Sequence, residues 1–266
     1  MLMKPNIHVD HLLTDHKSLV IALDQGLEHG PKEFTHTSID PDYVLDIAVK
    51  GKFNAIALQK GLAEHYYEHY HHSLPLILKL NGKTNIAHTD PYASQTCSVK
   101  YAIDLGAAAV GYTIYLGSPV EALMFKEFAK IQEEAHNYGI PVIAWMYPRG
   151  PFVPNDIHTD ILAYAARTAL ELGADFVKLK YNFDPDGYKW VVRCAGKCHV
   201  LTSGGEKMEI HKLLEQVQQV RDAGATGLAI GRNVWQHENP LLVTKAIKDI
   251  LFENKNIEHA LQLIKH

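Results

Sequence analysis

Short apolar runs alternate along the chain with longer segments whose apolar residues recur at helical spacing. Eight runs are rich in β-branched and other apolar residues, at 18–24, 54–59, 75–80, 108–113, 141–146, 175–180, 199–204 and 227–232. Helical patterns follow most of them, notably at 41–51, 119–139, 159–173 and 209–224, and each of these four ends in Gly. Glycine is favoured just beyond a helix C-terminus, so the alternation indicates parallel strands joined by helices.

The number of strand–helix repeats predicts which α/β architecture the chain adopts. Eight strand–helix repeats in 266 residues match a closed (β/α)8 TIM barrel, and we expect residues 1–266 to form this single domain. An open, doubly wound sheet is the alternative. Active-site groups of such barrels gather at the C-terminal ends of the strands. The longest irregular piece, about 25–39, follows the first strand, and its length predicts a functional loop.

The sixth run, 175–180, contains two lysines among apolar residues. Side chains alternate faces along a strand, so Phe176, Lys178 and Lys180 share the face that points into a barrel. Burial and a second nearby cation both lower the pKa of an ammonium group, which would let Lys178 form a Schiff base. The residues alone leave open that one lysine pairs with an acid such as Asp24 or extends to solvent.

Glycine-rich turns follow the seventh and eighth strands, LTSGGE at 201–206 and AIGRN at 229–233. In many barrels these two loops bind phosphate through backbone N–H groups, and Arg232 could add a bidentate contact. Ordinary strand-to-helix turns also contain glycine. The presence of both turns at the expected positions favours phosphate binding.

Two other strand ends carry candidate chemistry. Trp145 and Tyr147 lie two apart and share a face, where Tyr147 could transfer protons; alternatively, both rings fill the top of the barrel. Asp24 could stay ionised beside an iminium, or could cap a helix or form a salt bridge. Arg149 could bind a second anion.

Composition narrows the remaining possibilities. The formal net charge of −4 argues against a general nucleic-acid binder. Three cysteines do not suggest a disulfide framework, which favours a reducing, cytoplasmic location. The chain has no run of eighteen apolar residues, so we expect no membrane span.

The stretch HYYEH at 65–69 fits a zinc-binding pattern, with His65 and His69 four residues apart. It lacks an obvious third ligand. We therefore favour a solvent-exposed, histidine-rich helix and expect no metal site.

Several stretches together carry a resemblance to a known family. They are ALDQGLEHGP, CSVKYAIDLGAAAVGYTIYLGSP, IPVIAWMYPRG, GADFVKLKY, SGG and GRN, in this order and over nearly the whole chain. The chain resembles the archaeal-type class I fructose-1,6-bisphosphate aldolases of the DeoC/FbaB aldolase family. The resemblance implies a barrel enzyme, a lyase of glycolysis and gluconeogenesis, that cleaves a sugar bisphosphate through a covalent imine without a cofactor. It also implies a homo-oligomer.

The resemblance assigns roles to residues. It implies that Lys178 forms the Schiff base and Tyr147 transfers protons, with Asp24 and Trp145 beside them. The phosphate nearest the imine would be held by Ser203, Gly204, Gly205, Gly231 and Arg232. The other end of the sugar would meet Gln25, His29, Lys32 and Arg149. We expect Lys180 to lower the pKa of Lys178 and to contact substrate.

The chain departs from the family pattern at one site residue, and three other functions stay open. Gln25 stands where the family often has His, and it cannot carry charge. Related chemistry on the same lysine would be that of a transaldol-type synthase building an aromatic-amino-acid precursor, or of an acyl-transfer relative. A non-catalytic sugar-phosphate binder would need the phosphate turns but no reactive Lys178.

Overall fold

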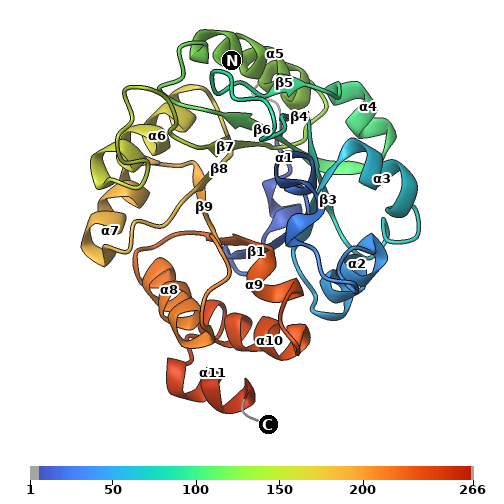
Figure 1. Cartoon of the computed structure of the whole chain (residues 1–266), viewed down its shortest axis with the longest axis vertical. Helices are drawn as coiled ribbons and strands as arrows, with labels where there is room; N and C mark the ends of the chain where they lie inside the picture. Colours follow the sequence, from blue (N-terminus) through green and yellow to red (C-terminus); the bar gives the residue numbers. More distant parts are fainter. Residues whose placement is uncertain (1–5, 265–266) are drawn as a thin grey trace.

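Eight parallel strands close into a barrel in the computed structural model, which describes residues 6–264 (Figure 1). The strands are β1 (Ser18–Ala22), β2 (Ala55–Gln59), β3 (Leu76–Lys79), β6 (Ala107–Ile114), β7 (Val142–Met146), β8 (Phe176–Leu179), β9 (His199–Ser203) and β10 (Gly227–Ile230). Their order around the barrel is β1-β10-β9-β8-β7-β6-β3-β2. The predicted (β/α)8 barrel is therefore confirmed, and the open-sheet alternative is excluded.

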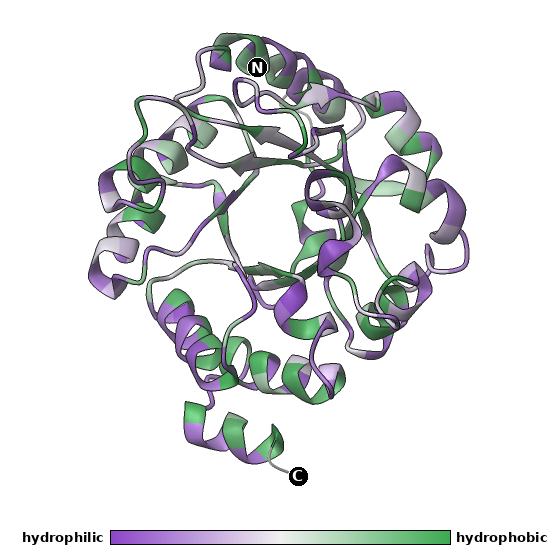
Figure 2. Cartoon of the chain, viewed as in Figure 1, coloured by the Kyte–Doolittle hydropathy of each residue, from purple (hydrophilic) through white to green (hydrophobic). Residues whose placement is uncertain are grey.

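Helices surround the barrel and cover its outer face (Figure 1). The longer ones are α2 (Pro41–Lys50), α3 (Lys60–Tyr66), α4 (Val99–Asp104), α5 (Glu121–Asn137), α6 (Thr159–Glu171), α7 (Pro185–Cys194), α8 (Ile210–Asp222), α10 (Pro240–Leu251) and α11 (Ile257–Ile264). The four helices predicted from the pattern are α2, α5, α6 and α8. Each helix in Figure 2 carries both apolar and polar residues, as expected where one side packs on strands and the other meets solvent.

Local sequence explains where these helices begin and end. The Asp40 side chain accepts a hydrogen bond from the backbone N–H of Asp42 at the start of α2, which satisfies one free donor of the first turn. Gly173 follows α6 with φ of 82°, a left-handed conformation that glycine adopts without a steric penalty.

Strand alternation divides the apolar residues into two clusters. The inner cluster fills the barrel and contains Leu12, Val20, Ala55, Ala57, Ile77, Ala109, Ile143, Trp145, Phe176, Leu201 and Ala229. Val177 and Leu179 belong to the outer cluster, between strands and helices. The predicted inward face of β8 is therefore confirmed. Leu12, from the short 3-10 helix η1 (Val9–Leu12), closes the bottom of the barrel, where the strands begin.

Space for one large side chain inside the barrel comes from Gly111 on β6. A Cβ atom on Gly111 would lie 2.2 Å from the six-membered ring of Trp145, so no other residue fits there without moving the indole. The Trp145 ring therefore lies across the interior, at the level where the inward side chains become polar.

The segment after β1 folds over the mouth of the barrel as α1 (Gly26–His29) and the 3-10 helix η2 (Gly30–Glu33). It is fastened to the short helix α9 (Arg232–Trp235) that follows β10, because Phe34 stacks on Trp235 with ring centroids 5.5 Å apart. The small antiparallel pair of β4 (Asn81–Gly82) and β5 (Ser94–Gln95) lies outside the barrel sheet. The predicted functional loop thus forms part of the mouth.

Candidate active site

A cavity of about 760 Å³ opens at the C-terminal ends of the strands. Its volume is typical of a site for a small molecule. Thirteen of the fourteen predicted site residues line it: Asp24, Gln25, His29, Trp145, Tyr147, Arg149, Lys178, Lys180, Ser203, Gly204, Gly205, Gly231 and Arg232. Lys32 does not, because it lies exposed on η2 and outside the cavity. The contact of Lys32 with the substrate therefore stays a prediction. Lys83, beyond the end of β3, also lines the cavity.

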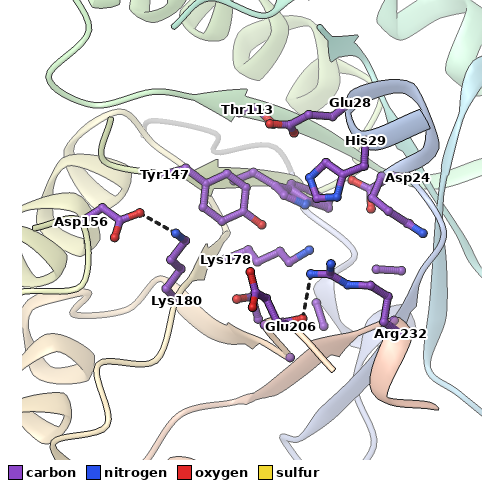
Figure 3. A pocket seen from close by; sticks show the side chains of 18 of the residues that line it. Asp24, Glu28, His29, Thr113, Tyr147, Asp156, Lys178, Lys180, Glu206 and Arg232 are labelled. Atoms are coloured by element: carbon purple, nitrogen blue, oxygen red, sulfur yellow. Dashed lines mark hydrogen bonds and ion pairs between the residues drawn. The ribbon is translucent and has the colours of Figure 1, made fainter. Parts of the chain in front are cut away.

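Lys178 lies at the centre of this cavity, where Tyr147 and Arg232 converge on it (Figure 3). Only 6% of its surface is exposed, and it forms no hydrogen bond or ion pair with any residue between 6 and 264. Its Nζ lies 5.3 Å from the centroid of the Trp145 ring. Burial lowers the pKa of Lys178, Asp24 and Glu28 oppose this effect, and Arg232 adds to it. The result is an amine whose protonated form is poorly stabilised, as a nucleophilic lysine requires.

Lys180 differs from the expectation. Strand β8 ends at Leu179, so the chain departs from the barrel wall before Lys180. Its side chain is 37% exposed and its Nζ is 2.5 Å from Asp156 Oδ2 (Figure 3). The cation that lowers the pKa of Lys178 is Arg232, and the charge of Lys180 is compensated by Asp156. The predicted influence of Lys180 on this pKa is therefore wrong.

A second buried lysine, Lys79, also lines the cavity, although it was not among the predicted site residues. It is 5% exposed at the end of β3, and its Nζ lies 3.5 Å from Asp24 Oδ2 and 4.9 Å from the Trp145 ring centroid. Burial lowers the pKa of Lys79, and Asp24 raises it. The run at 75–80 contained the signal, because Ile77 and Lys79 alternate as Phe176 and Lys178 do.

Tyr147 follows β7 and contacts the same space. Burial, followed by the carboxylates of Asp24 and Glu28, raises its pKa well above the usual value. The phenol therefore keeps its proton in the free protein and begins any reaction as a proton donor. Once deprotonated, it becomes a strong base.

Both arginines of the cavity are paired with glutamates of the segment that covers the mouth. Arg232 pairs with Glu33 and donates to the carbonyl oxygen of Gly205 at 3.0 Å. Arg149 Nη1 lies 3.2 Å from Glu28 Oε1. Neither glutamate was among the predicted site residues, although both lie in the loop that was predicted to be functional. The carboxylates show that each arginine can accept an anion in its present position.

The turn after β9 is held in shape by Asn233 of α9. The Asn233 side chain donates to the carbonyl oxygens of Gly204 at 2.8 Å and Glu206 at 2.9 Å, and accepts from the backbone N–H of Met208. Gly205 has a φ of 68°, which favours glycine at this position. The two glycine-rich turns therefore lie together and are fixed to each other by side-chain hydrogen bonds.

Two buried donors at the cavity have no partner among residues 6–264: Trp145 Nε1 and Gln25 Nε2. A buried donor without an acceptor costs about 1–3 kcal/mol. A ligand oxygen in the cavity could satisfy either group, which fits the expectation that Gln25 contacts substrate.

The alternative zinc site does not form. Helix α3 ends at Tyr66, so His65 lies on the helix and His69 in the turn after it, both exposed. The expected histidine-rich helix is thus shorter than the motif. Within the described part of the chain, no three His, Cys, Asp or Glu side chains are grouped to hold a metal ion. In the same part, no helix has the length and apolar character needed to cross a membrane.

Comparison with known proteins decides the class of this site. Residues 18–237 match the profile of the DeoC/LacD family aldolases. The chain belongs to this family. It is 46% identical over 250 residues to the class 1 fructose-bisphosphate aldolase of Thermoproteus tenax, covering 93% of this chain and 94% of the relative. It is 44% identical over 249 residues to the Halobacterium salinarum protein of the same name, covering 93% and 95%.

Solved structures of this aldolase family agree with the comparison of sequences. A Schiff-base-forming fructose-1,6-bisphosphate aldolase superimposes with a TM-score of 0.86 at 46% identity, covering 89% of this chain and 95% of the other. An archaeal fructose-1,6-bisphosphate aldolase, with its catalytic lysine covalently bound to the carbinolamine intermediate of the substrate, gives 0.88 at 45%, covering 91% and 97%.

Proposed function

We propose that this DeoC/LacD family aldolase reversibly cleaves fructose 1,6-bisphosphate into dihydroxyacetone phosphate and glyceraldehyde 3-phosphate through an imine on Lys178. The observation that carries the proposal is a buried lysine that has no counterion among residues 6–264, placed in a cavity beside a protonated tyrosine and two anion-binding arginines. The names of two curated relatives, both class 1 fructose-bisphosphate aldolases, support this substrate.

The first half of the reaction forms the imine. The neutral Lys178 amine attacks the C2 carbonyl of the open-chain ketose, and the Tyr147 phenol gives its proton to the departing oxygen, which leaves as water. The Trp145 ring, whose centroid lies 5.3 Å from Lys178 Nζ, faces the resulting iminium cation. Its indole N–H, which has no acceptor in the described part of the chain, binds a substrate oxygen. The Asp24 side chain lies nearby and orients the hydroxyl groups.

The second half breaks the bond between C3 and C4. The iminium accepts the electron pair of this bond, while the Tyr147 phenolate takes the proton of the C4 hydroxyl and glyceraldehyde 3-phosphate is released. The enamine is then protonated at C3 and hydrolysed to dihydroxyacetone phosphate, which restores the free amine. The iminium is the electron sink, so the reaction needs no metal or other cofactor.

The substrate phosphates explain the rest of the lining. The phosphate nearest the imine binds Arg232 and the turns that contain Ser203, Gly204, Gly205 and Gly231, where it competes with Glu33 for the guanidinium. The other phosphate lies toward Arg149 and His29, with Gln25 donating to the sugar. Lys180, at the rim, contacts the substrate through its ammonium group.

Three broader properties belong to this proposal. The reaction places the protein in glycolysis and gluconeogenesis, and the absence of disulfides among Cys97, Cys194 and Cys198 supports a cytoplasmic location. A homo-oligomer is favoured by the family resemblance and by exposed apolar side chains on α5 and α6, Leu123 at 53% and Tyr164 at 67%.

The decisive test combines turnover with trapping. The purified protein should release both triose phosphates from fructose 1,6-bisphosphate at an unchanged rate in excess EDTA. Borohydride added with dihydroxyacetone phosphate should leave a reduced adduct, which peptide mapping places on Lys178. Loss of activity in EDTA, or an adduct confined to another lysine, would overturn the proposal.

A second activity is favoured by one comparison. The chain is 37% identical over 265 residues, covering 92% of this chain and 84% of the relative, to the Methanocaldococcus jannaschii fructose-bisphosphate aldolase/6-deoxy-5-ketofructose 1-phosphate synthase. The same enamine could add to a different aldehyde in place of glyceraldehyde 3-phosphate. Incubating fructose 1,6-bisphosphate with an unphosphorylated acceptor aldehyde, followed by mass spectrometry of the products, would detect such a transfer; a mixture that contains only the two triose phosphates would exclude it.

A further inference from the structure

We propose that Lys79 is a positioning residue that holds the Asp24 carboxylate and so keeps Lys178 without a counterion. The proposal rests on the imine function of Lys178 and adds a residue to which the sequence analysis gave no role. It explains why the cavity contains two buried lysines when the chemistry uses one.

The geometry is asymmetric. Lys79 comes from β3 and Lys178 from β8, strands that are not neighbours in the barrel. Their Nζ atoms lie 4.9 Å and 5.3 Å from the centroid of the same Trp145 ring. Asp24 forms an ion pair with Lys79 at 3.5 Å, and no carboxylate lies within ion-pair distance of Lys178 among the described residues. Of the two buried lysines, Lys79 is therefore the one that forms an ion pair with Asp24.

The assignment matters because a buried ion pair is strongly coupled. A buried carboxylate without its cation destabilises the fold. Without Lys79, Asp24 would therefore pair with another cation nearby, and Lys178 is the candidate that it already influences. Lys178 already experiences Asp24, which raises its pKa against the effect of burial. A direct pair would raise it further and stabilise the ammonium form, which cannot attack a carbonyl.

The other charged groups that face Lys178 do not replace Lys79. Glu28 of α1 is bound by Arg149, and Arg232 of α9 is bound by Glu33. Tyr147, after β7, keeps its proton and stays neutral. The protonation of Lys178 thus depends on whether the Asp24 carboxylate pairs with Lys79 or with Lys178 itself.

The test is the pH dependence of imine trapping. Wild type, Lys79→Met and Lys79→Arg are reduced with borohydride in the presence of dihydroxyacetone phosphate over a range of pH. We expect Lys79→Met to move the midpoint upward by about one pH unit or more, which is roughly tenfold less neutral amine at a given pH below the midpoint. Lys79→Arg keeps a cation beside Asp24 and should retain the wild-type midpoint.

Two controls separate this role from a structural one. In the double variant Lys79→Met/Asp24→Asn the displaced carboxylate is gone, so the midpoint should return to the wild-type value or below it. Lys83→Met removes another cation of the cavity lining, one whose Nζ lies 5.8 Å from the Tyr115 ring, and should leave the midpoint unchanged. If Lys79→Met fails to fold, Lys79→Gln serves in its place.

The outcomes are distinct. If imine trapping becomes slower in Lys79→Met but its pH midpoint is unchanged or lowered, the inference is overturned. Lys79 would then have only a packing role. A wild-type protein without any trapped adduct would instead reject the imine function itself.

Discussion

Titratable side chains gather at both ends of the barrel, yet the two groups differ in how their charges are matched. At the bottom, His136 Nε2 lies 2.9 Å from Asp175 Oδ2, which also accepts from the backbone N–H of Val142 at 2.8 Å. His199 stacks on Phe176 and lies 3.3 Å from the hydroxyl of Thr226. At the mouth, Lys178 is more deeply buried than these groups and has no counterion among the described residues.

This difference separates structural from chemical clusters. The titratable side chains at the bottom have partners that connect the starts of β7, β8 and β9, and Leu12 is packed in the inner cluster. The mouth contains a cavity in which, among residues 6–264, one amine has no counterion and two buried donors have no acceptor. Charged residues alone therefore do not mark an active site; unmet polar groups beside open volume do.

Replacing Lys178 should have the largest effect on activity and little effect on the fold. Lys178→Met removes the nucleophile, and we expect turnover of fructose 1,6-bisphosphate to fall by roughly 10⁴-fold or more. The thermal midpoint should stay the same or rise, because a buried amine is replaced by an apolar side chain of similar length. Steady-state kinetics and calorimetry measure the two quantities.

The neighbouring lysine provides the matched control for that variant. Lys180→Met should still form the borohydride-trapped imine, because its ammonium is paired with Asp156 and lies away from Lys178 in the cavity. An active Lys178→Met protein, or a Lys180→Met protein without an imine, would reverse the assignment of the two residues.

Removing the acid at the bottom should have the opposite outcome. Asp175→Ala leaves the Val142 N–H and His136 without their acceptor, and we expect a loss of about 1–3 kcal/mol in the free energy of unfolding. The turnover number should be unchanged. Asp175→Asn keeps one acceptor oxygen and should lose less. Urea denaturation gives the stabilities; a fall in turnover for folded Asp175→Ala would break the comparison.

The smallest expected effect is the pH dependence of stability caused by His199. Burial lowers the pKa of His199 from its usual value of 6.5, assisted by His16 and opposed by Asp175 and Asp10. The unfolded chain therefore binds more protons than the folded one below that pH. The contribution of neutral His199 to the free energy of unfolding is fully present above pH 6.5. It decreases as the pH falls toward the lowered pKa of His199 in the folded protein. His199→Gln should show a shallower decrease in urea titrations; an equal slope would exclude His199 as its source.

The barrel and the reactive strand were predictable because they depend on short-range patterns. Alternation in β8 placed Lys178 inward, and the position of the glycine-rich turns placed Arg232 at the same mouth. The same rule applied to β3 would have added Lys79. These inferences use only the periodicity of a strand and the order of strands in a barrel.

The pairing of charges was not predictable in the same way. Lys180 was expected beside Lys178, but the partner of Lys180 is Asp156, in a loop between β7 and α6 with no regular pattern. The direction of Lys32 depends on the turn of η2, and the bond from Arg232 to Glu33 joins opposite ends of the chain. Such contacts depend on loop geometry that hydrophobic periodicity does not encode.

The pairing of Ser18 with Gly227, which joins the first and last strands, has a consequence during synthesis. Until β10 has left the ribosome the barrel cannot close, so the burial that lowers the pKa of Lys178 is not yet complete. An unfinished chain therefore carries a smaller fraction of neutral amine at Lys178, so we expect it to react more slowly with the aldehydes and ketoses of the cell. We therefore expect the full reactivity of Lys178 to develop when β10 pairs with β1 and closes the barrel.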